Sequence, residues 1–358
     1  MSDGSPAPKR SRVRRSVQSS VKLEDVARLA KVSTATASRV INSPEAVSAK
    51  TRLRVEKAIA ELGWIPHGAA QALASLRTRT VGALIPTLGH QTIATMLESL
   101  QQTLGNAGYT LLLGRPDASR ERTTVQLSKM IQNGVECMVL MGEDHPPELY
   151  ALLEQRKIFY VIAYTTGAYG HTNCIGIDNH DEMRKMVSYL LGLGHRSFGI
   201  IAANHDHNDR IRLRIDAIRD TLAAEGIAVR PQHFKVVPNW TIACGRQGME
   251  AILEEDVRPT AVICTNDYLA TGAVIEAKAA GLSVPGDLSI SGFDDNELAS
   301  HMDPPLTTVH VPAAEMGRTI AEHVIFVLDG GEAELPLRLE AQLVIRNSTA
   351  APPAGPQG

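Results

Sequence analysis

The chain has 358 residues, of which 44% are apolar and 21% are charged, a composition typical of a soluble protein with sizeable cores. At ~100–200 residues per domain, this length predicts two or three domains. The longest apolar runs have about five to seven residues, too few for a membrane-spanning helix. The four cysteines lie far apart, which excludes a disulfide scaffold and a cysteine zinc finger. No apolar signal segment follows the basic N-terminus, so we expect a cytoplasmic protein.

The net charge of −3 is distributed unevenly along the chain. Residues 1–80 contain 15 lysine and arginine residues against 6 aspartate and glutamate residues, whereas the remaining residues are acidic overall. A basic segment attached to an acidic body indicates that the segment meets a polyanion. From charge alone, a basic surface that is simply solvated is the alternative to a surface that binds a polyanion.

The two ends of the chain have the composition of unstructured segments. Residues 1–21 combine Ser and Pro with Arg and Lys and hold few apolar side chains, which predicts a disordered basic arm. Residues 350–358 are rich in Pro and Gly, which predicts a disordered tail.

Short helices are predicted after the basic arm. The first covers Leu23–Ala30, with Val26, Leu29 and Ala30 on its inward face. A three-residue break leads to a second helix over Thr34–Asn42. Two helices joined by so short a turn are typical of a helix-turn-helix.

Capping residues support the ends of these helices. Ser33 can cap the second helix, and Ser48 can cap a third helix over Ala49–Leu62. Gly63 suits the position that follows the last helical residue. The three helices together predict a small domain over residues 22–66.

From residue 81 onward, short apolar runs alternate with amphipathic helical stretches. The runs are Val81–Ile85, Leu111–Leu113, Met138–Met141, Tyr160–Ile162, Phe198–Ala202, Ala261–Cys264 and Leu288–Ile290, and a last strand is expected over Leu337–Arg346. Continuous apolar strands separated by helices predict an α/β fold, with parallel sheets covered on both faces. About 270 residues of this pattern exceed one typical unit, so we expect two lobes over residues 81–349.

The helical segment carries a family resemblance. The run LEDVARLAKVSTATASRVIN, followed by VSAKTRLRVEKAIAELGWIPHGAAQALAS, resembles the DNA-binding domain of the lactose/galactose-repressor (LacI/GalR) family of bacterial transcription regulators. In that family, the positions of Thr34, Ala35 and Arg39 read bases in the major groove. The DNA-binding residues that the resemblance implies are Ser33, Thr34, Ala35, Thr36, Ser38, Arg39 and Asn42.

Residues 67–80 resemble the hinge helix and linker of the same family. Gly68 weakens an isolated helix by roughly 1 kcal/mol relative to Ala, so we expect the hinge to be mostly unfolded without DNA. Leu73 stands where the family wedges a leucine into the minor groove, and such wedges kink a duplex.

The body resembles the effector domain of this family, which is similar to periplasmic sugar-binding proteins. The runs that carry the resemblance are IGIDNHDEMRKMVSYLLGLGHRSFGII, AVICTNDYLATGAV, GLSVPGDLSISGFDD and PPLTTVHVPAAEMGRTIAEHV. The resemblance implies polar effector ligands at Arg214, Asn266 and Asp294, with Trp240 stacking on the effector. Asp178 is a further candidate, although capping of the helix that begins at Asn179 explains it equally well.

The identity of the effector stays open between a sugar and a sugar acid. Many sugar-binding members have Asp where this chain has Tyr164, and three arginines cluster nearby at Arg210, Arg212 and Arg214. An anionic sugar would suit those arginines. Pairing of Arg210 and Arg212 with Asp206, Asp209 and Asp216 is the alternative.

The sequence therefore predicts a homodimeric, ligand-controlled repressor that binds a pseudo-palindromic operator. Enzyme signatures are absent, because no phosphate-binding glycine loop, nucleophile elbow or metal-binding H-E-x-x-H motif occurs. We expect no cofactor and no metal, and interpret His205 and His207 as part of a polar loop. A periplasmic-type sugar-binding protein without a role at DNA is the alternative.

Overall fold

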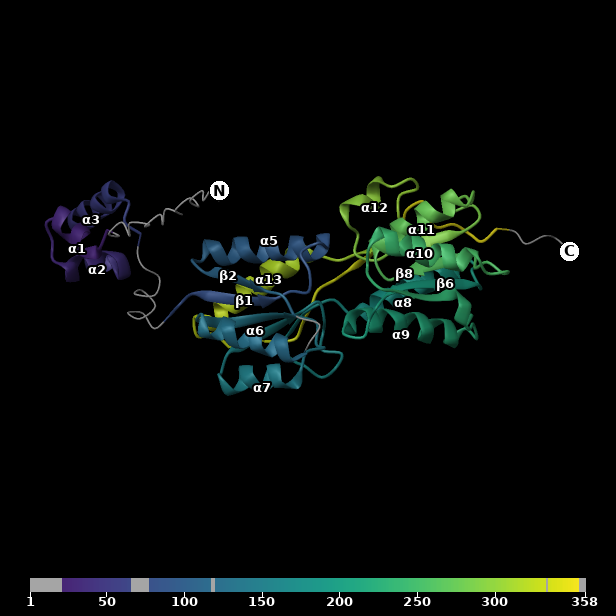
Figure 1. Cartoon of the computed structure of the whole chain (residues 1–358), viewed down its shortest axis with the longest axis horizontal. Helices are drawn as coiled ribbons and strands as arrows, with labels where there is room; N and C mark the ends of the chain where they lie inside the picture. The colour runs from purple at the N-terminus through teal and green to yellow at the C-terminus, as the bar shows by residue number, and fades with distance from the viewer. Residues whose placement is uncertain (1–20, 66–76, 117–119, 333, 354–358) are drawn as a thin grey trace, which may run out of the picture. The chain divides into compact units, whose positions relative to one another are not determined.

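The structure is a computed structural model that describes residues 21–65, 77–116, 120–332 and 334–353. The chain divides into two compact units (Figure 1): residues 1–78, which we call the head, and residues 79–358, which we call the body. No helix in the described ranges is long and apolar enough to cross a membrane.

The head contains three α-helices around a small apolar core. Its elements are α1 (Leu23–Leu29), α2 (Thr34–Asn42), the 3-10 turn η1 (Pro44–Ala46) and α3 (Ala49–Leu62). Val26, Ala37, Val40, Val55 and Ala58 are buried between the helices. The predicted ranges of the second and third helices are confirmed, and α1 ends one residue earlier than predicted.

The capping predictions differ in outcome. The Ser33 hydroxyl accepts a hydrogen bond from the backbone N–H of Thr36 at 3.1 Å, which confirms it as the cap of α2. Gly63 ends α3 in the left-handed region at φ 58°, as predicted. Ser48 occupies the N-cap position of α3, as predicted, but its hydroxyl donates to the Thr51 side chain and caps no backbone N–H. Leu29 is also not inward, since 42% of it is exposed at the end of α1.

The first lobe of the body is built on a six-stranded parallel sheet. Its strands run in the order β11-β5-β4-β3-β1-β2. They are β1 (Thr80–Leu84), β2 (Thr110–Gly114), β3 (Val135–Met141), β4 (Phe159–Ala163), β5 (Cys174–Gly176) and β11 (Leu337–Arg338). Helices α5 (Gln91–Asn106) and α13 (Ala313–Leu328) cover one face, and α6 (Arg120–Gln132) and α7 (Pro147–Gln155) cover the other (Figure 1).

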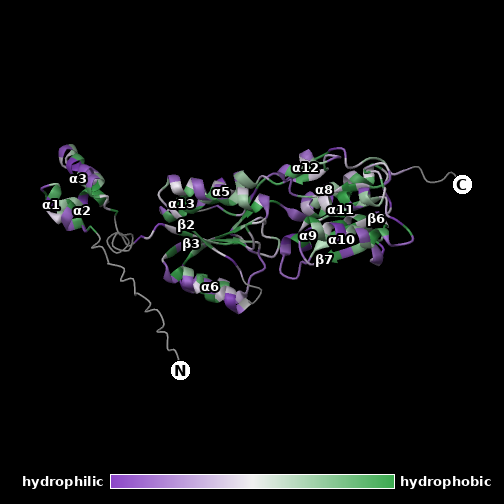
Figure 2. Cartoon of the chain, turned by 45° about the horizontal axis from the view of Figure 1, so that its top comes forward, coloured by the Kyte–Doolittle hydropathy of each residue, from purple (hydrophilic) through white to green (hydrophobic). Residues whose placement is uncertain are grey.

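The second lobe repeats this plan with a four-stranded parallel sheet in the order β7-β6-β8-β9. Its strands are β6 (Phe198–Ala203), β7 (Phe234–Val237), β8 (Ala261–Cys264) and β9 (Ser289–Ser291). Helices α8 (Asn179–Gly192) and α9 (Asp209–Ala224) lie on one face, and α10 (Ile242–Leu253) and α11 (Asp267–Ala279) lie on the other. The short helices η2 (Pro231–His233) and α12 (Glu297–His301) complete this lobe. In Figure 2 the strands are largely green, whereas the covering helices also show purple.

Two parallel-sheet lobes confirm the predicted fold class, but the end of the chain differs from the prediction. The single strand expected over Leu337–Arg346 is two strands, because β11 pairs with β5 and β12 (Gln342–Val344) pairs antiparallel with β10 (Thr308–His310). The chain therefore crosses from one sheet to another within this segment. The predicted tail also begins too early, since Ala350 exchanges hydrogen bonds with the Ser289 side chain.

Close packing of α10 on α11 depends on glycine. A Cβ added at Gly272 would meet the backbone of Ile242, Gly245 and Arg246 across the interface. We expect Gly272→Ala to destabilise the body by about 1–3 kcal/mol, because backbone atoms cannot move aside for the methyl group. Gly105 is the matched control, since it lies exposed on α5 with open space and Gly105→Ala favours the helix by up to ~1 kcal/mol. Urea unfolding of both variants measures the two opposite effects.

Candidate DNA-binding helix and effector cavity

The second helix of the head presents a polar face to solvent. Ser33, Thr34, Ala35 and Arg39 are exposed, whereas Ala37 and Val40 of the same helix are buried in the core of the head. Thr36 and Ser38 lie half-buried between these two faces. An exposed helix with short polar side chains near its first turn has the shape that the major groove accepts.

Two of the predicted DNA-binding residues, Asn42 and Leu73, fall wholly or partly outside the described part of the structure. Asn42 is the last residue of α2, and its side chain lies outside the described part of the structure. Leu73 lies within residues 66–76, which are outside the described ranges, as are residues 1–20 of the predicted arm.

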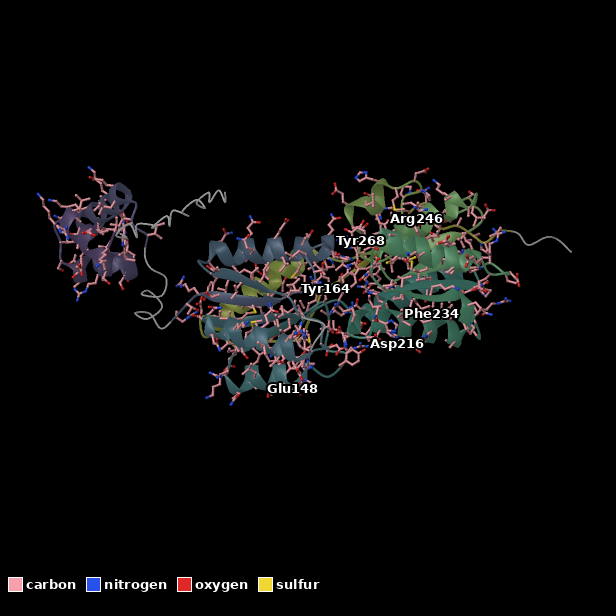
Figure 3. All side chains as sticks on the ribbon, viewed as in Figure 1. Glu148, Tyr164, Asp216, Phe234, Arg246 and Tyr268 are labelled. Atoms are coloured by element: carbon pink, nitrogen blue, oxygen red, sulfur yellow. The ribbon has the colours of Figure 1, made fainter. Side chains whose placement is uncertain are left out.

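A cavity of about 330 Å³ lies in the body, lined by residues of both lobes. This volume is within the range of small-molecule sites. Tyr164, labelled in Figure 3, lies on its wall where the two lobes face one another. The lining residues are Pro86, Thr87, His90, Thr92, Ile93, Met141, Tyr164, Asn204, Asp206, His207, Asn208, Arg210, Ile211, Arg214, Pro238, Trp240, Asn266 and Asp294.

The structure brings together four of the five predicted effector residues. Arg214, Trp240, Asn266 and Asp294 all line the cavity, although they come from α9, the segment before α10, the segment before α11 and the segment after β9. Asp178 does not line it. Its carboxylate accepts the Asp181 backbone N–H at 2.9 Å, so it caps α8, as the alternative interpretation expected.

The Arg214 side chain is buried and held from several directions. Its Nε donates to Asn179 Oδ1 at 3.0 Å, and its Nη1 donates to the Thr265 carbonyl at 2.8 Å. The guanidinium carbon lies 3.6 Å from the centre of the Phe293 ring, and Nη1 lies 3.6 Å from Asp294 Oδ1. Burial lowers the pKa of Arg214 to about 10, so the side chain stays cationic at pH 7. The result is a rigid cation beside a buried carboxylate.

Two residues of the cavity wall have backbone conformations that non-glycine residues rarely adopt. Tyr164 has φ 65° and Asp294 has φ 117°. Such conformations cost on the order of 1–3 kcal/mol each and collect at binding sites. The carboxylates of Asp294 and Asp295 have different partners. Asp294 lies beside Arg214, whereas Asp295 pairs with Arg346 at 2.7 Å.

The Tyr164 hydroxyl has no hydrogen-bond partner among the described residues, although it is buried. Burial raises the pKa of this phenol above its ordinary value, with the Asp294 carboxylate as a further cause, so the hydroxyl keeps its proton. A buried hydroxyl without a partner on a cavity wall is a donor available to a ligand.

His90 also lines the cavity and was not predicted from the sequence. His90 Nε2 lies 3.3 Å from Asp294 Oδ2, and its Nδ1 lies 2.9 Å from Thr92 Oγ1. The sequence feature that could have identified His90 is its position in the segment after β1. Ligands of open α/β sheets bind at the carboxyl ends of the strands. Arg210 pairs with Asp209 at 3.2 Å, as the alternative expected, yet it also lines the cavity.

Two family descriptions match the chain in separate regions. Residues 22–67 match the bacterial regulatory proteins of the lacI family. Residues 187–349 match the periplasmic binding protein-like domain. The transcriptional repressor CytR of Escherichia coli strain K12 is 33% identical over 333 residues, which cover 92% of this chain and 97% of the relative. The chain belongs to the lacI family.

Solved structures of transcriptional regulators are similar to this chain over most of its length. The lac repressor dimer bound to operator and the anti-inducer ONPF has a TM-score of 0.83 at 27% identity, over 93% of this chain and 100% of that chain. The transcriptional regulator CelR in complex with cellobiose has a TM-score of 0.66 at 27% identity, over 92% and 99% of the two chains.

Membership of the lacI family confirms the resemblance drawn from the sequence. The protein is a transcriptional repressor that combines a helix-turn-helix head with a periplasmic-binding-protein-like body, and it is not an enzyme. Its two functions are therefore to bind DNA and to bind a small effector.

Proposed function

We propose that this lacI-family repressor is a cytoplasmic homodimer that binds a pseudo-palindromic operator and is controlled by a neutral, sugar-like effector. The observation that carries the proposal is the cavity between the lobes, which Arg214 and Asp294 line together with the aromatic side chains of Trp240 and Tyr164. The match of residues 22–67 to the lacI family speaks against the alternative of a sugar-binding protein without a role at DNA.

The dimer is supported by the symmetry of DNA recognition. Two heads related by a two-fold axis match two half-sites of a pseudo-palindrome. The similar lac repressor structure is a dimer bound to operator. On each half-site, we propose that Thr34, Ala35 and Arg39 read bases, while Ser33, Thr36, Ser38 and Asn42 hold phosphates.

The charges on the cavity wall favour a neutral effector over a sugar acid. Two arginines, Arg210 and Arg214, are matched by two aspartates, Asp206 and Asp294. A guanidinium beside a carboxylate binds neighbouring hydroxyls through several hydrogen bonds, and an aromatic ring covers the apolar face of a sugar. CelR, a protein of the same architecture, was solved with the sugar cellobiose.

A thermal-shift screen of neutral sugars, sugar acids and nucleobases tests the effector class. A ligand that binds only the folded body raises the melting temperature in proportion to the logarithm of its concentration. We expect neutral sugars to raise it and sugar acids to have little effect. Stabilisation by sugar acids alone would overturn the proposal of a neutral effector.

The Tyr164 hydroxyl provides a sharper test of the cavity. Because this hydroxyl has no partner among the described residues, Tyr164→Phe should leave the free energy of unfolding nearly unchanged. Effector affinity should fall by ~0.5–1.5 kcal/mol, the contribution of an ordinary hydrogen bond. Urea unfolding and calorimetry with the screened effector separate the two effects. An unchanged affinity would show that the hydroxyl does not contact the effector.

A further inference from the structure

We infer that the body contains a latch that holds its two lobes together from outside the effector cavity. The latch joins the loop after β3 in the first lobe to the start of α9 in the second. Its members are Glu143, Asp144, Asp209 and Arg212, none of which lines the cavity.

Polar contacts cross between the lobes at this point. The backbone N–H of Glu143 donates to Asp209 Oδ2 at 2.7 Å, and Asp209 is almost fully buried. Arg212 Nη2 lies 2.8 Å from Asp144 Oδ2, with both side chains mostly removed from solvent. A short, partly buried ion pair is screened by salt much less than a surface pair.

Each half of the latch is anchored within its own lobe. On the first lobe, the Glu143 side chain accepts a hydrogen bond from the Thr165 hydroxyl at 2.5 Å and another from the Tyr169 backbone N–H at 3.1 Å. On the second lobe, Arg212 Nη1 donates to the carbonyls of His205 and Asp206 at 2.9 and 3.2 Å. Because both halves are pre-positioned, little side-chain freedom is lost when they meet.

Glycine leaves room at the latch for side chains of the second lobe to reach the backbone of the first. Gly142 has φ 73°, and a Cβ placed on it would meet the side chains of Asp209 and Arg210. The close approach of the lobes therefore depends on this position as well as on the charges.

The latch affects effector binding because it changes the fraction of molecules in which the two lobes of the body are closed on each other. The cavity walls come from both lobes, so an effector that contacts both binds the closed arrangement. Apparent affinity falls in proportion to the closed fraction. The latch raises that fraction without touching the effector, so it increases the sensitivity of the repressor. This consequence rests on the proposed effector function, whereas the latch itself does not.

Distance measurement between spin labels tests the latch without any effector. Glu148 on α7 and Asp216 on α9 are exposed and lie on different lobes (Figure 3), and all four native cysteines are buried. The full chain with Glu148→Cys and Asp216→Cys, labelled and diluted with unlabelled protein, reports the lobe separation by double electron–electron resonance. We expect one narrow distribution for this protein.

Two variants break the latch in different ways, and one serves as the control. Asp144→Asn removes the charge, and Gly142→Ala places a methyl group where the Asp209 and Arg210 side chains lie. Both should shift the label distance upward and broaden it. Glu255→Gln breaks an ion pair of 3.1 Å with Lys235 inside the second lobe, and it should leave the distance unchanged.

The possible results of these distance measurements test the latch independently of the proposed effector function. A distance distribution in either latch variant that matches the parent would overturn the latch, as would a broad, long distribution in the parent itself. Circular dichroism shows whether each variant is folded, and if Asp144→Asn is not, Gly142→Ala decides. Failure to find a sugar effector would leave these distances untouched, because the measurement uses none.

Discussion

Arg214→Ala is expected to abolish the response of the repressor to its effector while operator binding persists. The substitution removes a buried cation that stands beside Asp294 on the cavity wall. A hydrogen bond to a charged group contributes ~1.5–3 kcal/mol, so losing it should lower effector affinity by roughly 10- to 150-fold. Calorimetry with the screened effector measures the affinity, and a gel shift with and without effector measures the response.

Arg214 also stabilises the folded body, so the experiment needs two further variants for comparison. Removing its side chain leaves Asn179 Oδ1 and the Thr265 carbonyl without this donor, which lowers the melting temperature. Arg214→Lys keeps the charge but loses the planar fork, so it should fold and still bind effector poorly. Arg246→Ala is the control, because Arg246 is exposed on α10 (Figure 3) and pairs with Glu276. Undiminished effector affinity in a folded Arg214→Lys variant would remove Arg214 from the site.

The layers of the fold could be predicted because they follow from local patterns. Apolar runs such as Ala261–Cys264 lie between helical stretches, and the strand found there has these same bounds. Two of the short strands were missed, since β5 has only three residues and β7, at the edge of its sheet, has an exposed residue, Val236. Strands this short form because they pair and pack with neighbouring strands. The periodicity of the sequence does not reveal that pairing.

In the candidate site, too, residues marked by a local sequence motif could be predicted, whereas contacts between residues far apart in the sequence could not. Arg214, Asn266 and Asp294 were found because family motifs mark them in the sequence. His90 was missed because its partner Asp294 lies more than two hundred residues away, and only the lobe arrangement brings the two together. Arg212 was expected to pair with nearby aspartates, but it pairs with Asp144 of the other lobe. Contacts across the cleft depend on how the lobes meet, and no local pattern encodes that.

The last prediction concerns the choice of operator. Varying Thr34 and Ala35, which are exposed at the start of α2, should change which operator is preferred more than it changes non-specific affinity. A good base contact discriminates by ~1–3 kcal/mol, so the preference should move by roughly 5- to 150-fold. Selection of randomised operators with each variant, at one fixed salt concentration, measures the preference.

Arg39 should behave differently from its neighbours because it carries a charge. Arg39→Ala is expected to weaken specific binding by a similar ~1–3 kcal/mol and to relax the preference at one base pair. Ala60→Ser is the control, since Ala60 is exposed near the end of α3, away from the first turns of α2. An unchanged operator preference in the whole Thr34 and Ala35 series would mean that another surface of the head reads the bases. Non-specific affinity would then fall with salt as before, because that dependence comes from phosphate contacts.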